Sequence, residues 1–215
     1  MDVLIDQWPQ VMAGFWTTLQ LLAISGVIAT ALGTVLAAMR VSPVPVLRAA
    51  GTTYVNTLRN TPLVLLFTLV SFGLPTIQIR FSFFAFAIIA LSAYTAAFVC
   101  EALRSGVNAV HTGQAEAARA LGMTFGQTLR LVVLPQAFRT VIPPLASIYI
   151  ALTKNTAIAE AFAVTEATYQ LDSLVRDFPN VLYYLFFGIA LGYIVIAWTI
   201  ALAARLFERK LAVAR

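Results

Sequence analysis

Long apolar runs separated by short polar segments dominate this chain. Each of the clearest runs approaches or exceeds the roughly 20 apolar residues that a helix needs to cross the hydrocarbon layer. These runs cover residues 11–39, 81–103, 138–164 and 181–206. The pattern predicts an all-α polytopic membrane protein in which residues 1–215 form a single transmembrane domain and residues 1–10 form a short external interfacial segment.

A fifth apolar run, over residues 54–74, is weaker. It becomes strongly apolar only from Pro62, and its first half contains Arg59 together with several amide and hydroxyl side chains. Hydropathy alone therefore allows either a crossing or a re-entrant segment. We expect Pro62 to break this run, and Pro143 and Pro144 to break the fourth, because proline removes a helical hydrogen bond.

Composition and charge define the surroundings of these runs. The chain is 60% hydrophobic and 11% charged, with a mean hydropathy of +0.87, so its solvent is lipid. The net charge of +5 does not indicate a nucleic-acid partner, because excess Lys and Arg in a membrane protein mark the cytoplasmic loops. Basic residues gather in segments 40–48, 104–139 and 205–215. About five transmembrane helices, with the N-terminus outside and the C-terminus cytoplasmic, place all three segments inside; a re-entrant fifth run would separate the first two.

Residues with catalytic or metal-binding chemistry are sparse. Cys100 and His111 are each the only residue of their type, so we expect neither an intrachain disulfide nor a metal site. No phosphate-binding Gly-x-x-x-x-Gly-Lys-Ser/Thr motif occurs in the sequence. We expect no catalytic residue and no cofactor in this chain, so a partner must supply any nucleotide chemistry.

The polar segment between the third and fourth runs predicts a compact helical projection over residues 113–134. Gly113 is expected to cap a first helix that places Glu116 in its first turn, near the positive end of the helix dipole. Gly122 is expected to end that alanine-rich helix in a left-handed turn. Taken alone, this pattern also fits an ordinary amphipathic cytoplasmic loop.

A second helix is predicted directly after Gly122. Thr124 and Gln127 have the spacing of a capping box. An apolar stripe follows that is expected to lie along the membrane face until Pro135, formed by Phe125, Leu129, Val132 and Val133.

The spacing in this segment resembles that of a known family. It is similar to the EAA motif of ATP-binding-cassette (ABC) importer permeases at Glu116-Ala117-Ala118, Gly122, Val132 and Leu134-Pro135. Other stretches resemble the polar-amino-acid branch: Arg59-Asn60-Thr61-Pro62-Leu63, Ala93-Tyr94, Glu101 with Arg104, Gly113-Gln114, residues 134–139 and Lys154-Asn155-Thr156. Residues 39–43, Asn60, Ser105-Gly106 and residues 151–156 look most like actinobacterial glutamate-transport permeases. The resemblance covers nearly the whole chain.

The resemblance implies a fold, a function and partners. The fold is that of a type I (MetI-like) importer permease in the bacterial cell (inner) membrane. The function is ATP-driven import of polar amino acids, with glutamate or a related amino acid as the substrate. The implied partners are a cytoplasmic ABC ATPase dimer that binds ATP and Mg, an extracellular or periplasmic substrate-binding protein, and a second permease subunit, different from this chain or a second copy of it. The implied ATPase-coupling residues are Glu116, Ala117, Ala118, Arg119, Ala120, Leu121 and Gly122.

Ionisable groups at membrane depth mark pathways or buried pairs. Arg59 can bind carbonyls freed at Pro62 or an acidic partner, or it can contact substrate. Glu101 and Arg104, three residues apart, are expected to form a pair. Lys154 can meet a substrate carboxylate beside Asn155 and Thr156, or it can reach outward to Glu160 or Glu166. Both alternatives stay open for Lys154.

Other functions remain possible for such a chain. One alternative is a secondary transporter driven by an ion gradient, although no inverted pair of interrupted helices is visible in 215 residues. A second is an ABC permease for a basic amino acid, and a third is a scaffold that recruits an ATPase without transport. An ABC permease should copurify with an ATPase, whereas a secondary transporter should not. Stimulation of ATP hydrolysis by a loaded binding protein distinguishes a transporter from a scaffold, and the amino acid that stimulates it identifies the substrate.

Overall fold

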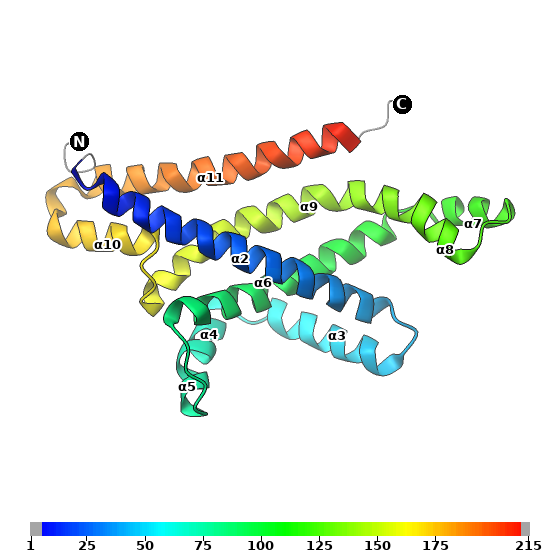
Figure 1. Cartoon of the computed structure of the whole chain (residues 1–215), viewed down its shortest axis with the longest axis horizontal. Coiled ribbons are helices and arrows are strands. Elements are labelled where there is room, and N and C mark those ends of the chain that lie inside the picture. Colours follow the sequence, from blue (N-terminus) through cyan, green and yellow to red (C-terminus); the bar gives the residue numbers. More distant parts are fainter. Residues whose placement is uncertain (1–5, 212–215) are drawn as a thin grey trace.

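The computed structural model describes residues 6–211, and all regular structure in this range is helical. Its long helices are α2 (Trp8–Val41), α3 (Pro45–Arg59), α6 (Phe83–Asn108), α9 (Leu134–Asn155) and α11 (Leu182–Leu211). They run along the long axis of the molecule (Figure 1). The predicted all-α architecture is confirmed; part of the predicted segment 1–10 lies outside the described residues.

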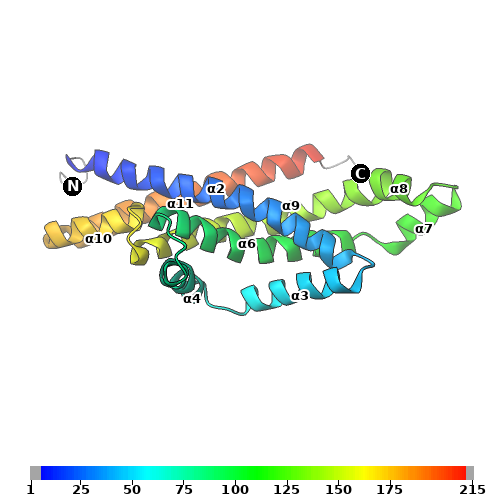
Figure 2. The same ribbon diagram turned by 60° about the horizontal axis from the view of Figure 1, so that its bottom comes forward.

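Short elements connect the long helices. The connections are α4 (Leu63–Thr68), the π-helix η1 (Leu69–Gly73), α5 (Leu74–Thr76), α7 (Thr112–Ala120), α8 (Phe125–Thr128), the π-helix η2 (Leu129–Val133), the 3₁₀-helix η3 (Thr156–Phe162), α10 (Ala167–Asp177) and η4 (Pro179–Val181). Figure 1 shows α7 and α8 at one tip of the molecule, and α10 beside the start of α2 at the opposite end. In Figure 2, α3 and α4 lie below the long helices α2, α6 and α9.

The structure contains four or five candidate membrane spans within the described residues. Four helical stretches are long and apolar enough by themselves: Trp8–Val41, Phe83–Asn108, Phe125–Phe162 and Pro179–Lys210. Pro45–Arg59 and Leu63–Thr76 form a fifth candidate that is bent by 106° at its break. The predicted break before Pro62 is therefore confirmed.

Two predictions about proline were wrong. Pro143 and Pro144 lie inside α9, which continues through both. The apolar stripe does not end at Pro135, because α8 passes through the π-turn η2 into α9, giving one helical stretch over Phe125–Phe162. Each π-turn is followed directly by a Leu-Pro pair: Leu74-Pro75 follows η1, and Leu134-Pro135 follows η2. A wider turn before a proline helps to accommodate the ring and the missing N–H, so the chain bends instead of ending the helix.

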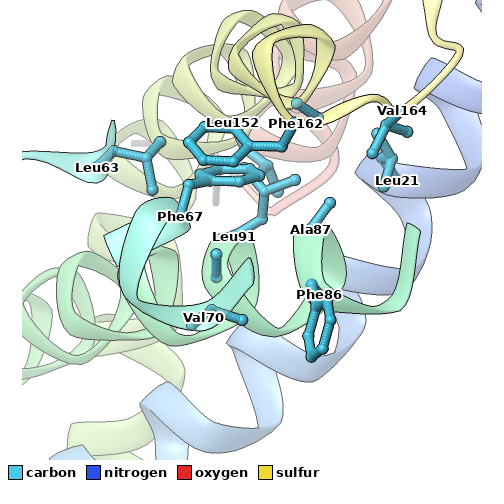
Figure 3. Packing of buried hydrophobic residues seen from close by; sticks show 12 residues of the cluster. Leu21, Leu63, Phe67, Val70, Phe86, Ala87, Leu91, Leu152, Phe162 and Val164 are labelled. Carbon is cyan, nitrogen blue, oxygen red and sulfur yellow. The ribbon is translucent and has the colours of Figure 1, made fainter. Parts of the chain in front are cut away.

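The largest core cluster lies where the bent pair meets the main bundle. Phe67 of α4 stacks on Phe162 of η3, with ring centroids 5.0 Å apart. Leu21, Leu91 and Leu152 complete the contact from α2, α6 and α9 (Figure 3). All of these side chains are buried, so this cluster fixes the far end of α9 against the broken span.

Glycines allow the long helices to approach closely, as small residues do in membrane proteins. A Cβ at Gly33 of α2 would lie 2.7 Å from Val99 of α6. A Cβ at Gly192 of α11 would collide with the Phe15 ring of α2. The close approach at Gly192 therefore brings the first and last spans together.

Candidate functional site

The tip formed by α7 and α8 is built by local capping. His111 is the N-cap of α7, and its Nδ1 accepts a hydrogen bond from the Gly113 N–H at 3.1 Å. The prediction that Gly113 caps the helix with Glu116 in the first turn was therefore wrong. The imidazole starts the helix earlier, at Thr112, and leaves the first turn without an acidic residue.

The other predicted caps at this tip are confirmed. Gly122 adopts a left-handed conformation with φ +81° and ends α7. The N–H of Met123 donates to the Ala118 carbonyl at 3.2 Å, and that of Gly122 donates to the Arg119 carbonyl at 2.9 Å, as in a Schellman motif. Thr124 and Gln127 form the predicted capping box. Two capped helices joined by one tight turn thus make a defined projection.

The outer surface of the tip combines apolar and charged groups. Leu121 is 84% exposed and Phe125 is 79% exposed. Glu116 and Arg119 are also exposed, and neither takes part in an ion pair within residues 6–211. Ala118 is buried, so within the predicted coupling set this residue packs inside the tip while the others lie on its surface.

A second cluster surrounds Glu101 on α6. The predicted pair with Arg104 is present, with Arg104 Nε donating to Oε1 at 2.9 Å. Arg40 from the end of α2 also pairs with Oε1, and Arg59 from the end of α3 donates to Oε2 at 3.0 Å. The Arg59 guanidinium additionally lies 5.6 Å from the centre of the Phe98 ring. One carboxylate therefore holds three helices together.

This cluster has more positive than negative charge. Its arginines differ in burial: the Arg40 side chain is 12% exposed, whereas Arg59 and Arg104 are 41% and 38% exposed. Sequence reasoning anticipated an acidic partner for Arg59 and missed the role of Arg40. The available signal for Arg40 was its position as the cation that closes the first span.

Lys154 lies in a different place. It is exposed and lines a cavity of about 340 Å³ together with Thr168 and Tyr193. No acidic side chain among the described residues forms an ion pair with it. Asn155 is half-buried, and Thr156 is buried, with its hydroxyl donating to the Thr153 carbonyl at 2.7 Å. Arg59 does not line this cavity.

Glu166 is not the partner of Lys154. It is fully buried and caps α10, where it accepts hydrogen bonds from the Tyr169 N–H at 2.9 Å and the Tyr193 hydroxyl at 2.5 Å. Thr18 of α2 contributes a third, longer hydrogen bond at 3.3 Å. Burial raises the pKa of Glu166, and these hydrogen bonds partly oppose the rise. Sequence reasoning had considered Glu166 only as a partner that Lys154 could reach, and so missed this role.

No metal centre is visible in the part of the chain that the structure describes. No group of three or more His, Cys, Asp or Glu side chains there is placed to hold a metal ion.

The fold and the exposed tip can now be compared with known proteins. The family described as binding-protein-dependent transport system inner membrane component matches residues 12–213. The chain belongs to this family. It is 42% identical over 220 residues to the glutamate transport system permease protein GluC of Corynebacterium efficiens, covering 97% of this chain and 96% of that protein. The protein of the same name from Corynebacterium glutamicum is 41% identical with the same coverage.

Membership in this inner membrane family is supported by a solved structure. The crystal structure of an amino acid ABC transporter with histidines has a chain that is 29% identical to this one, with a TM-score of 0.89 and 96% of each chain covered. The expected MetI-like fold of an ABC permease is confirmed, as is the expected place of the protein in the bacterial cell membrane.

Proposed function

We propose that this chain is the permease subunit of an ABC importer for glutamate or a related polar amino acid. The observation that carries the proposal is the projecting tip of α7 and α8: α8 is the start of the continuous helical stretch Phe125–Phe162, and one tight turn at Gly122 joins α7 to it. A partner that moves the tip would move this stretch with it. The similar Corynebacterium proteins carry glutamate transport in their names, which supports the choice of substrate.

In this proposal, residues 116–122 dock in a groove of a cytoplasmic ABC ATPase dimer, and the ATPase binds ATP and Mg. Leu121 and Phe125 supply the exposed apolar contact, while Glu116 and Arg119 supply charges that a partner can complement. ATP binding then favours one of two permease conformations because the closed ATPase binds that conformation more tightly. The tip and the C-terminus face the cytoplasm, and the N-terminus faces outside.

The remaining partners follow from the same proposal. A second permease subunit, preferably a related chain, completes the pathway, and an external substrate-binding protein delivers the amino acid. Lys154 is the strongest pathway candidate of this chain because it is a cation without an acidic partner in the described structure and lines a cavity with two hydroxyls. Asn155 and Thr156 are weaker candidates, because Thr156 is buried and Asn155 is only half-exposed. Arg59 is the weakest, because Glu101 already binds it.

Copurification tests the docking step. We expect Leu121→Asp to remove the ATPase from the detergent-purified complex, because a charge would enter an apolar contact. Val46→Asp is the matched control, since Val46 is also apolar and 75% exposed but lies on α3. If both variants retain the ATPase equally, the docking surface is elsewhere.

Reconstitution tests the substrate. Glutamate delivered by its binding protein should stimulate ATP hydrolysis by the wild-type complex. The similar solved structure is described as an amino acid ABC transporter with histidines, which supports a basic amino acid as the second candidate. Stimulation by histidine or arginine without a response to glutamate would replace the proposed substrate, and transport by a chain purified without any ATPase would replace the proposed mechanism.

A further inference from the structure

The helical stretch that carries the tip packs against α6, α11 and α2, and two of its contacts with this bundle are fixed by side-chain hydrogen bonds. The first is on α6, where the Thr140 hydroxyl donates to the Gly106 carbonyl at 3.1 Å. A Cβ at Gly106 would collide with Val141, so the two backbones can approach this closely only because this residue is glycine. We call this contact the lower anchor of α9.

The second attachment is on α2 and involves Tyr149. Its hydroxyl donates to the Gly26 carbonyl at 3.2 Å and is hydrogen-bonded to the Thr30 hydroxyl. A Cβ at Gly26 would lie 2.7 Å from Cε1 of the Tyr149 ring, so the ring rests in a notch that the glycine leaves open. We call this contact the upper anchor.

Pro143 and Pro144 lie between the two anchors. Proline has no N–H, so the carbonyls of Arg139 and Thr140 lack their usual helical donors. Such positions bend more easily than the rest of a helix. α9 is therefore held to two different helices on either side of its most deformable point.

There is also room beside the upper anchor. A cavity of about 550 Å³ lies next to Tyr149 and is lined by Trp16 and Gln20 of α2 and Ile200 of α11, among others. The Tyr149 side of α9 borders this space, whereas Leu152 of α9 is buried in the core cluster with Phe67 and Phe162, so a turn about Tyr149 also moves that cluster.

We propose that Tyr149 is a positioning residue, the pivot about which the outer part of α9 turns when the tip moves. That outer part ends at Lys154, the pathway candidate, so a displacement of the tip becomes a rotation of the Lys154 end. The Pro143-Pro144 joint lets the two parts move by different amounts. The inference rests on the proposed function for its consequence in transport, and on the anchors alone for its geometry.

Tyr149→Phe is the central test, because it removes both hydrogen bonds of the hydroxyl and keeps the ring in the Gly26 notch. Thr30→Val removes one of the same bonds from the other side. Tyr183→Phe is the matched control, since Tyr183 lies 73% exposed on α11. All three variants should assemble with wild-type yield.

The first readout needs no partner. In the full-length chain with Cys100→Ala and Lys154→Cys, the rate of labelling by a water-soluble maleimide reports the mobility of the outer part. We expect Tyr149→Phe to change this rate at least about threefold, which corresponds to the about 0.6 kcal/mol typical of one hydrogen bond between membrane helices. Tyr183→Phe should leave it unchanged. Equal rates in both variants would overturn the pivot whatever the chain transports.

The second readout uses the complete transporter with native Lys154. Tyr149→Phe and Thr30→Val should lower the number of substrate molecules moved per ATP at least about threefold, while basal hydrolysis and melting temperature match Tyr183→Phe. A role in stability alone would lower the melting temperature and leave this ratio unchanged, which would contradict the proposal. A wild-type complex with no response to any loaded binding protein would refute the proposed function, and the labelling result would still decide the pivot.

Discussion

The Glu101 cluster gives the sharpest test of how the bundle is held together. Glu101→Gln keeps the shape of the side chain and removes its charge, so Arg40, Arg59 and Arg104 would face one another without a carboxylate. The ends of α2 and α3 should then separate from α6. We expect a large loss of stability.

The magnitude follows from the burial of each pair. Arg40 is only 12% exposed, and removing one partner of a largely buried ion pair costs about 3 kcal/mol. The pairs with Arg59 and Arg104 are more exposed, and each contributes about 0.5 kcal/mol. Glu101→Gln should therefore cost about 4 kcal/mol, whereas Arg104→Gln should cost less than about 1 kcal/mol.

Unfolding of the purified protein in detergent measures these differences. Arg48→Gln is the control, because Arg48 is exposed and bonds the Ser42 carbonyl at 3.3 Å. The double variant Glu101→Gln with Arg40→Gln should recover part of the loss, since it removes the most deeply buried unpaired charge. If Glu101→Gln loses no more stability than Arg104→Gln, the carboxylate does not hold the three helices and the reasoning fails.

Three further results are expected. Gly192→Ala should lower stability by about 1–3 kcal/mol in the same unfolding assay, because its Cβ collides with Phe15; unchanged stability would mean that α11 can shift freely. Gly122→Ala should weaken ATPase copurification with little change in global melting, because a left-handed φ of +81° costs a non-glycine residue about 1–2 kcal/mol; full copurification would show that the turn is not needed for docking. Burial raises the pKa of Glu166 in the folded protein above its value in the unfolded chain. The contribution of Glu166 to stability is therefore full below the pKa of the unfolded chain and declines as pH rises through the pKa of the folded protein. Melting temperatures from pH 4 to 8 should show a smaller decline for Glu166→Gln, and parallel curves would contradict this.

Much of the fold could be predicted because the decisive signals are local. A membrane span is visible in a window of about 20 residues. The capping box at Thr124 and the left-handed Gly122 depend on neighbours within a few positions. The tip was predicted for this reason, although its first helix starts earlier than Gly113 because the His111 side chain can also act as a cap.

The contacts that connect distant segments could not be predicted in this way. Arg40 and Arg59 lie 61 and 42 positions from Glu101, and nothing near either residue indicates a shared partner. Glu166 carries the charge pattern of a surface loop, yet it is buried through Thr18 and Tyr193, which come from two other helices. These pairings depend on how the helices pack.

The 106° bend between α3 and α4 has a consequence for biogenesis. Asn60 and Thr61 bond carbonyls of the preceding turn, at 2.7 Å and 2.8 Å, but α4 begins at Leu63 without a side-chain cap. Acyl chains cannot hydrogen-bond the amides at such a helix start, so protein or water must cover them. Where the partner subunits proposed above supply this cover, a chain made without them should be degraded faster than one made together with them.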